Sequence, residues 1–301
     1  MDALFAANVP DLSAWGTFVH VKRSTPRKHL HRSLDISVQA SAPNYQQIIH
    51  ELSRCIASAR LDIQYLQLWE NAVNGTIHLS TNDQSLIARA LARGICAAGT
   101  VTPTSIPVCN DDHFKGHLVE VIHYCIRIFL LNTGKAHPLI FEPSLPKASP
   151  TIPGIDLLEV GGIDGRFHFF VWECKGTDAS AVTALNKAAA QLCSPEGTAQ
   201  QSFMEAYRCL QTADILNHDH NLAQFVAEMP RAFYDASANE AKRFGGMVGT
   251  SMGSPVSVTS FVGGVGDSVS DSHQHCQVVV VRIKDFDQFR RDVFGHLWNI
   301  F

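Results

Sequence analysis

The stretch GIDLLEVGGIDGRFHFFVWECKG, residues 154–176, decides the fold that this sequence predicts. It holds two runs rich in apolar, β-branched and aromatic residues, which is typical of β-strands. Between the runs lies Asp164-Gly165, a dipeptide favoured in two-residue type I′ turns because both positions need positive φ. The sequence therefore predicts an antiparallel hairpin at the centre of a sheet.

The turn also fixes which residues face each other. If it forms at these positions, Ile163 pairs with Arg166. Counting outward from that pair places Asp156 directly opposite Glu173, so that both side chains project from one face. Lys175 is two residues beyond Glu173 and joins them on that face. Two carboxylates and one ammonium group are thus expected together at the open end of the hairpin.

This grouping suits chemistry on phosphate. Two carboxylates held side by side repel each other, so a compensating charge is required. A divalent cation such as Mg²⁺ binds one or two carboxylates, and a neighbouring lysine supplies a point charge for phosphate or for an attacking water. The pattern therefore favours phosphodiester hydrolysis, in which the metal lowers the pKa of bound water. The alternative is an ion-paired cluster in which Lys175 only neutralises one carboxylate.

The same residues resemble the PD-(D/E)xK nuclease superfamily, through PGID at 153–156, a short hairpin, and WECKG at 172–176. The resemblance implies an α/β fold, restriction-endonuclease-like, with a mixed central sheet flanked by helices and a helical N-terminal region. It implies that Asp156, Glu173 and the backbone carbonyl of Cys174 bind Mg²⁺ or Mn²⁺. Lys175 would then orient or activate the nucleophilic water.

The superfamily also commonly places an acidic residue on the helix before these strands. Glu120, in GHLVEVIHYC at 116–125, is the matching candidate for a further catalytic acid. A single acid on an otherwise apolar helix is equally suited to be a salt-bridge partner, and His117 and His123 flank it. The sequence leaves both interpretations of Glu120 open.

Within the superfamily, the chain is similar to the nuclease subunit of Hachiman-type antiphage defence systems. The similarity lies in an acidic helix containing glycine, a Gly-x-Asp strand, Glu-x-Lys followed by helices, and a late VVVV strand before an Asp-Phe helix. It implies an effector nuclease that acts on DNA together with a helicase or ATPase partner. A non-catalytic regulatory or DNA-binding subunit with a nuclease fold is the main alternative.

Composition bounds these expectations. A chain of 301 residues that is 46% hydrophobic can bury a full core. Charged residues make up 17% and the formal net charge is −4, so a wholly basic surface is excluded and any contact with nucleic acid must be local. We expect a mainly helical region over 1–105 and a nuclease-like α/β domain over 106–301.

Periodicity places the remaining elements. The Gly/Ser/Val stretch 245–272 is predicted to be flexible or rich in turns, and the basic run 22–32 to be a solvated loop or a phosphate-gripping segment. QVVVVRI at 277–283 predicts a strand covered on both faces. Apolar spacing and end signals predict helices over 41–60, 61–73, 83–98, 118–131, 179–192, 199–216, 222–228, 232–243 and 286–300.

Cysteine usage and hydropathy suggest a compartment. The eight cysteines are scattered, with no Cys-x-x-Cys pair, which indicates reduced and mostly buried thiols in a cytoplasmic protein. The first residues lack the pattern of an export signal, and no window approaches the 18 or so apolar residues of a membrane span. We therefore expect no membrane association.

One further motif competes with the hairpin. GTSMGSP at 249–255 satisfies Gly-x-Ser-x-Gly and is similar to the nucleophile segment of subtilisin-like proteases, which would make Ser251 a hydrolase nucleophile. That chemistry needs an Asp on an upstream strand and a His at a helix start, and neither pattern precedes the motif. The β-branched residues that follow also differ from the helix expected after a nucleophile elbow. A serine hydrolase is the minor alternative.

Overall fold

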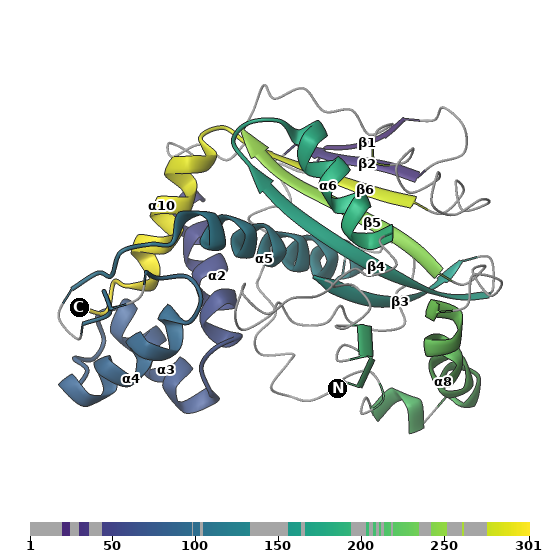
Figure 1. Ribbon diagram of the computed structural model, residues 1–301. Helices are drawn as coiled ribbons and strands as arrows, with labels where there is room; N and C mark the ends of the chain where they lie inside the picture. Colours follow the sequence, from purple (N-terminus) through teal and green to yellow (C-terminus); the bar gives the residue numbers. More distant parts are fainter. Residues whose placement is uncertain are drawn as a thin grey trace.

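The structure is a computed structural model that describes residues 20–24, 30–35, 44–97, 99–102, 105–132, 156–163, 166–193, 203–204, 207–208, 211, 214–217, 219–234, 242–251, 261 and 276–301. The strands described are β1 (His20–Ser24), β2 (Leu30–Asp35), β3 (Leu157–Ile163), β4 (Arg166–Thr177), β5 (Lys242–Ser251) and β6 (Cys276–Ile283). They form one six-stranded sheet in the order β1-β2-β6-β5-β4-β3. Strands β2, β6, β5 and β4 run parallel, while β1 and β3 pair antiparallel at the two edges. The expected class, a mixed sheet flanked by helices, is confirmed (Figure 1).

The hairpin register agrees with the sequence prediction. Ile163 pairs with Arg166. Further along, Leu158 pairs with Val171 and Val160 pairs with Phe169, as the count predicted. Asp164-Gly165 itself lies outside the described residues. This is the register that counting outward from the pair Ile163 and Arg166 predicts, and a slip by one residue would turn the side chains of a strand to the opposite faces.

The prediction of a flexible segment from residue 245 onward is wrong at its start, because β5 is a central strand between β4 and β6. Glycines give this strand little intrinsic β-propensity, but the fold requires them. A Cβ on Gly245 would lie 2.1 Å from the ring of Trp172, and one on Gly249 would lie 2.6 Å from a methyl of Val119. Larger side chains fill the space above each glycine, which the segment's own sequence does not reveal.

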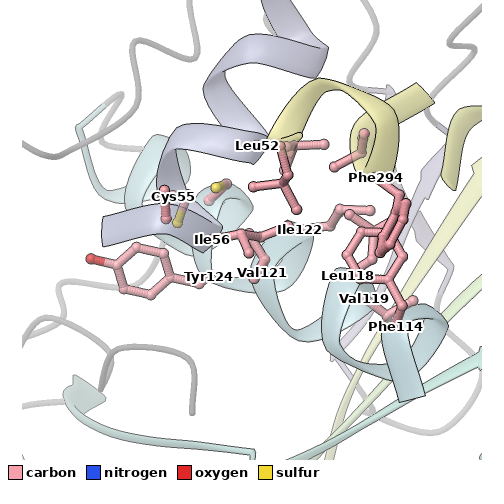
Figure 2. Packing of buried hydrophobic residues seen from close by; sticks show 14 of the residues in the cluster. Leu52, Cys55, Ile56, Phe114, Leu118, Val119, Val121, Ile122, Tyr124 and Phe294 are labelled. Atoms are coloured by element: carbon pink, nitrogen blue, oxygen red, sulfur yellow. The ribbon is translucent and has the colours of Figure 1, made fainter. Parts of the chain in front are cut away.

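Helices cover the sheet in two layers (Figure 1). On one face lie α2 (Tyr45–Ser58), α5 (Asp111–Asn132) and α10 (Phe286–Leu297); on the other lie α6 (Ala181–Cys193) and α8 (His220–Tyr234). Strand β4 serves both layers by alternation, since Phe170 and Trp172 pack toward α5 whereas Phe169 and Val171 pack toward α6. Figure 2 shows the first layer, where Leu52 of α2, Ile122 of α5 and Phe294 of α10 meet. In the described part of the chain, no helix has the length and apolarity needed to cross a membrane.

Two small helices pack beside α2, and glycines mark their ends. Helix α3 (Ile63–Val73) starts where the Asp62 side chain accepts from two backbone N–H groups, and it stops before Gly75 at φ +69°. This confirms the helix predicted over 61–73. Helix α4 (Thr81–Ala92) ends earlier than the predicted residue 98, because Gly94 takes φ +76° and turns the chain away.

The sequence between α6 and β5 was predicted less well. Helix α8 contains the segment predicted over 222–228 and continues through Pro230 to Tyr234. The helix predicted over 232–243 is wrong at its end, because Lys242 already pairs with Phe169 in the parallel ladder of β4 and β5. A backbone committed to a ladder cannot also make helical hydrogen bonds.

The N-terminal region contains strands as well as the expected helices. The basic run 22–32 was expected to be a solvated loop or a phosphate-gripping segment, but its residues 22–24 and 30–32 lie on β1 and β2, which form an antiparallel pair. Strand β2 then pairs with β6, with Leu30 opposite Gln277. Leu52, from the N-terminal region, and Phe294, from the last helix, likewise belong to one hydrophobic core beneath α5. The expected boundary between 105 and 106 therefore crosses both the sheet and one core.

A histidine pair joins α2 to α10 and predicts a pH-dependent stability. Nδ1 of His50 lies 3.1 Å from Nε2 of His296, so one neutral ring donates to the other. Burial lowers the pKa of His50, and burial and His50 lower the pKa of His296 to about 4. A folded-state pKa below the unfolded value of 6.5 means that protonation opposes folding. The stabilisation is complete above about pH 6.5 and is lost as the pH falls toward 4.

Urea denaturation between pH 7 and pH 4 measures this effect. Because the His296 ring is half-buried and screened, we expect His296→Gln to remove only on the order of 1 kcal/mol of the pH dependence. The exposed His78 provides the control, since His78→Gln should leave the pH profile unchanged. Identical profiles for the wild type and His296→Gln would contradict the interpretation.

Candidate functional site

The open end of the hairpin brings Asp156 next to the chain around Glu173. The ladder ends at the pair Leu157 and Trp172, one residue short of the predicted pairing of Asp156 with Glu173. Asp156 lies in a bend just beyond, where its N–H donates to the Trp172 carbonyl at 3.0 Å. Its Oδ2 accepts from the backbone N–H of Cys174 at 2.6 Å. The Asp156 carboxylate is thus held by a backbone N–H donor as well as by the place of Asp156 at the end of the hairpin.

Glu173 and Lys175 continue the alternation of β4 toward the α6 face. Both Asp156 and Glu173 are only 5% exposed. Lys175 Nζ donates to Glu173 Oε1, and its own side chain is mostly buried. Burial alone would lower the pKa of Lys175, but the carboxylates of Glu173 and Asp156 outweigh burial and raise it. The three predicted residues therefore form one buried cluster in which the lysine stays protonated at neutral pH.

Cys174 faces the other way, toward α5. Its Sγ lies 3.4 Å from Nδ1 of His123, and the His123 ring contacts Trp172 edge to face at 4.4 Å between centroids. Burial raises the pKa of the Cys174 thiol well above its ordinary value, and the carboxylates of Asp156, Glu120 and Glu173 add to that shift. The thiol is therefore an inert, protonated side chain within range of all three acids. The backbone N–H of Cys174 donates to the Asp156 carboxylate.

Helix α5 reaches the site closely because two glycines lie beneath it. A Cβ on Gly176 would lie 2.8 Å from the Lys115 side chain, and Gly249 is similarly covered by Val119. Lys115 also pairs with Asp178, just beyond the end of β4. Glu120 follows Val119 on the same helix. The close approach of α5 explains how Glu120 affects Cys174, whose side chain faces this helix.

Glu120 has its own buried partners, which the sequence did not reveal. Nδ1 of His117 lies 3.6 Å from Glu120 Oε2, one helical turn away. Arg60, which follows α2, donates from Nη1 to His117 Nε2 at 2.8 Å. A guanidinium can only donate, so Nε2 must accept and the ring proton sits on Nδ1, facing Glu120. Arg60, His117 and Glu120 thus form a polar chain between α2 and α5.

These contacts suit Glu120 as a partner of buried polar groups, and its interpretation as a metal ligand stays a prediction. Burial lowers the pKa of Arg60 to about 10, against the opposing effect of Glu120, so the guanidinium stays charged at neutral pH. Among the residues that the structure describes, no three His, Cys, Asp or Glu side chains gather as a group able to hold a metal ion. Asp156, Glu173 and Lys175 meet on one face, whereas Glu120 lies with Arg60 on the other. Nothing in the sequence links Arg60 to Glu120, since 59 residues separate them.

Removing the guanidinium tests this role of Glu120. Arg60→Met leaves the buried Glu120 carboxylate and the acceptor on His117 without their cation, so we expect the free energy of unfolding to fall by about 2 kcal/mol. Adding Glu120→Gln in the same chain should recover part of the loss. Arg54→Met is the matched control, because the more exposed pair of Arg54 with Glu70 should contribute at most about 0.5 kcal/mol. Equal losses in urea denaturation for the two arginine variants would contradict the assignment.

Ser251 is the last residue of β5, where it pairs with Ile283 and is partly exposed. It lies at the carboxyl end of a parallel strand, as a strand-borne nucleophile does. Residues 252–255, the rest of the motif, lie outside the described part of the chain. The hydrolase interpretation of Ser251 therefore stays a prediction.

The buried hairpin cluster of Asp156, Glu173 and Lys175 is the best-formed candidate site in the described residues. Comparison of the chain with protein-family models, with curated proteins and with solved structures finds no match.

Proposed function

We propose that this protein is a metal-dependent nuclease whose site is built on Asp156, Glu173 and Lys175. The observation that carries the proposal is that they lie together at one end of the β3–β4 hairpin, with Asp156 and Glu173 buried and Lys175 mostly buried. Two carboxylates beside one ammonium group in a site of low dielectric favour the binding of a further positive charge. A structural ion pair needs only one acid, so the second carboxylate favours a site for a cation.

The donor set fits a hard divalent cation. Mg²⁺ and Mn²⁺ prefer oxygen ligands and are held in proteins by one or two carboxylates with water and substrate phosphate. We propose Asp156 and Glu173 as the protein ligands, with the backbone carbonyl of Cys174 beside them. When bound, such a cation supplies a water of lowered pKa and positive charge for the phosphate oxygens.

The protein's own groups prepare this site. The Cys174 N–H holds one oxygen of Asp156, which limits the rotation of that carboxylate. Lys175, kept protonated by the two acids, is placed to donate to a phosphate oxygen or to orient the attacking water. Glu120 lies on the other face of the sheet, with Arg60 and His117, and contributes to the site from there. In this proposal the fold is restriction-endonuclease-like, with the hairpin at its catalytic edge.

The proposed substrate is DNA, captured with the help of another protein. A net charge of −4 gives the molecule little long-range attraction for a polyanion. A partner that binds and opens the duplex would supply that attraction. The resemblance to the Hachiman-type nuclease subunit favours a helicase or ATPase in this role and places the complex in antiphage defence.

The direct test is a cleavage assay with the purified chain. We expect single- or double-stranded DNA to be cleaved in Mg²⁺ or Mn²⁺, and cleavage to stop when the metal is removed with EDTA, because the proposed mechanism takes its water of lowered pKa from the bound cation. Asp156→Asn should abolish cleavage, while Asp178→Asn, on the exposed pair with Lys115, should not. Cleavage that persists in EDTA would refute the metal-dependent mechanism. DNA binding without cleavage, with and without an ATPase partner, would instead favour the non-catalytic subunit.

A further inference from the structure

Two cysteines outside the candidate site lie opposite each other in a short antiparallel bridge. Cys96 follows α4, and Cys109 precedes α5 by one residue. Backbone bonds flank the pair on both sides, from Ala97 N–H to the Val108 carbonyl and from Asn110 N–H to the Ile95 carbonyl, each at 2.8 Å. Neither cysteine bonds the other through its backbone. The two therefore occupy a non-hydrogen-bonded position of the antiparallel pairing.

That position has the geometry of a disulfide. Cα atoms in such pairs are about 4.5 Å apart, with both side chains on one face. Disulfides span Cα distances of about 4.4 to 6.8 Å. Linking Cys96 to Cys109 thus requires rotation of the side chains and little movement of the backbone. The two flanking hydrogen bonds keep the chains in register while this happens.

Exposure separates this pair from the other thiols that the structure describes. Cys55 and Cys125 also contact each other, but both are buried between α2 and α5, where Figure 2 shows Cys55 on the side of α2 near Tyr124. Cys174 is buried beneath α5. Cys96 and Cys109 are each only partly buried. A reagent in solution can reach this pair while the folded core protects Cys55, Cys125 and Cys174.

We propose that Cys96 and Cys109 form a reversible disulfide by exchange with a low-molecular-weight disulfide such as oxidised glutathione. The thiolate of one cysteine attacks the reagent, forms a mixed disulfide and releases one glutathione thiolate. The thiolate of the second cysteine then attacks the protein sulfur and releases the second glutathione. Two protein thiols are oxidised, one small disulfide is reduced to two thiols, and the protons lost by the cysteines return to the released glutathione.

The bond would connect the end of α4 to the start of the helix that carries Glu120. Cys109 hydrogen-bonds to Asp111 in the first turn of α5, and Arg60 lies close enough to Cys96 to oppose the shift in its pKa. Burial raises the pKa of both thiols to about 12, so few are ionised at neutral pH. Exchange should therefore be slow at pH 7 and accelerate as the pH rises. The inference does not depend on the proposed nuclease activity.

Tryptic mapping of the full chain gives a direct readout. Trypsin leaves both cysteines in one peptide, residues 94–115, because Arg93 and Lys115 bound a stretch without Lys or Arg. After equilibration with oxidised glutathione at about pH 8.5 and alkylation of free thiols, we expect this peptide to be unalkylated. Its mass should be about 2 Da below that of the reduced peptide, and dithiothreitol should restore both thiols. The native core should protect the Cys125 thiol from oxidation. We therefore expect the peptide that contains Cys125 to be alkylated once the protein has been denatured.

Controls and a second preparation keep the test decisive. Cys96→Ser and Cys109→Ser should each leave a single thiol that carries glutathione or is alkylated, whereas Cys55→Ser should still lose both thiols of peptide 94–115. Refolding the reduced protein in the same redox buffer removes any limit set by access to the folded state. A peptide 94–115 that stays doubly alkylated, or that carries only glutathione, after both procedures would overturn the proposal.

Discussion

Replacing Lys175 with alanine is expected to lower the rate of metal-dependent DNA cleavage by about 100-fold or more. The ammonium group is buried beside Glu173 and Asp156, and both acids raise its pKa, so it is a fixed positive charge in a site of low dielectric. Such a charge stabilises the phosphate oxygens most in the transition state, and its loss should reduce kcat more than it raises KM. Single-turnover cleavage of a labelled oligonucleotide measures the effect.

Lys115→Ala is the matched control for this variant. Lys115 also pairs with a carboxylate, that of Asp178, near the end of β4, but it lies on α5 and outside the cluster. We expect its removal to leave cleavage within a few-fold of the wild-type rate. Cooperative thermal unfolding of both variants shows that each is folded. Cleavage by folded Lys175→Ala at a rate close to that of the wild type would remove Lys175 from the mechanism.

The largest expected loss of stability comes from Gly245→Ala in the central strand β5. The new methyl would lie 2.1 Å from the Trp172 ring, well inside van der Waals contact, and that ring is fully buried. Neither partner can move freely, because Gly245 and Trp172 are neighbours in the parallel ladder of β4 and β5. We expect the free energy of unfolding to fall by about 3 kcal/mol or more, as a lower midpoint in urea.

Gly295→Ala tests whether the effect belongs to the site or to the substitution. Gly295 lies within α10, and a Cβ there would meet no atom within 4 Å. Alanine is the better helix former, so this variant should be as stable as the wild type or more stable by up to about 1 kcal/mol. Gly245→Ala with wild-type stability would contradict the packing of Trp172 over β5.

The hairpin shows which structural features the local sequence could predict. Counting outward from the Asp164-Gly165 turn predicted the register of β3 and β4, and the alternation along β4 placed Glu173 and Lys175 on one face. The predicted ladder was one residue too long, because Asp156 lies in a bend beyond it, where its carboxylate accepts from the Cys174 N–H. Helix α3 was equally readable, with Asp62 at its start and Gly75 after its end. In both cases the determining residues lie within the segment that they shape.

Other features depended on residues far apart in the chain. Strand β5 is poor in strand-forming residues, and only Trp172 and Val119, which fill the space above its glycines, make it a central strand. Two further features likewise arise from packing. One is the contact of Arg60 with His117 and of His117 with Glu120, and the other is the bridge that places Cys96 opposite Cys109. The sequence by itself determined the periodic elements and the cluster within one hairpin, because periodicity and turn chemistry are local. The tertiary structure alone decided the partners of buried charges and the need for small residues, because both depend on which side chains meet across the fold.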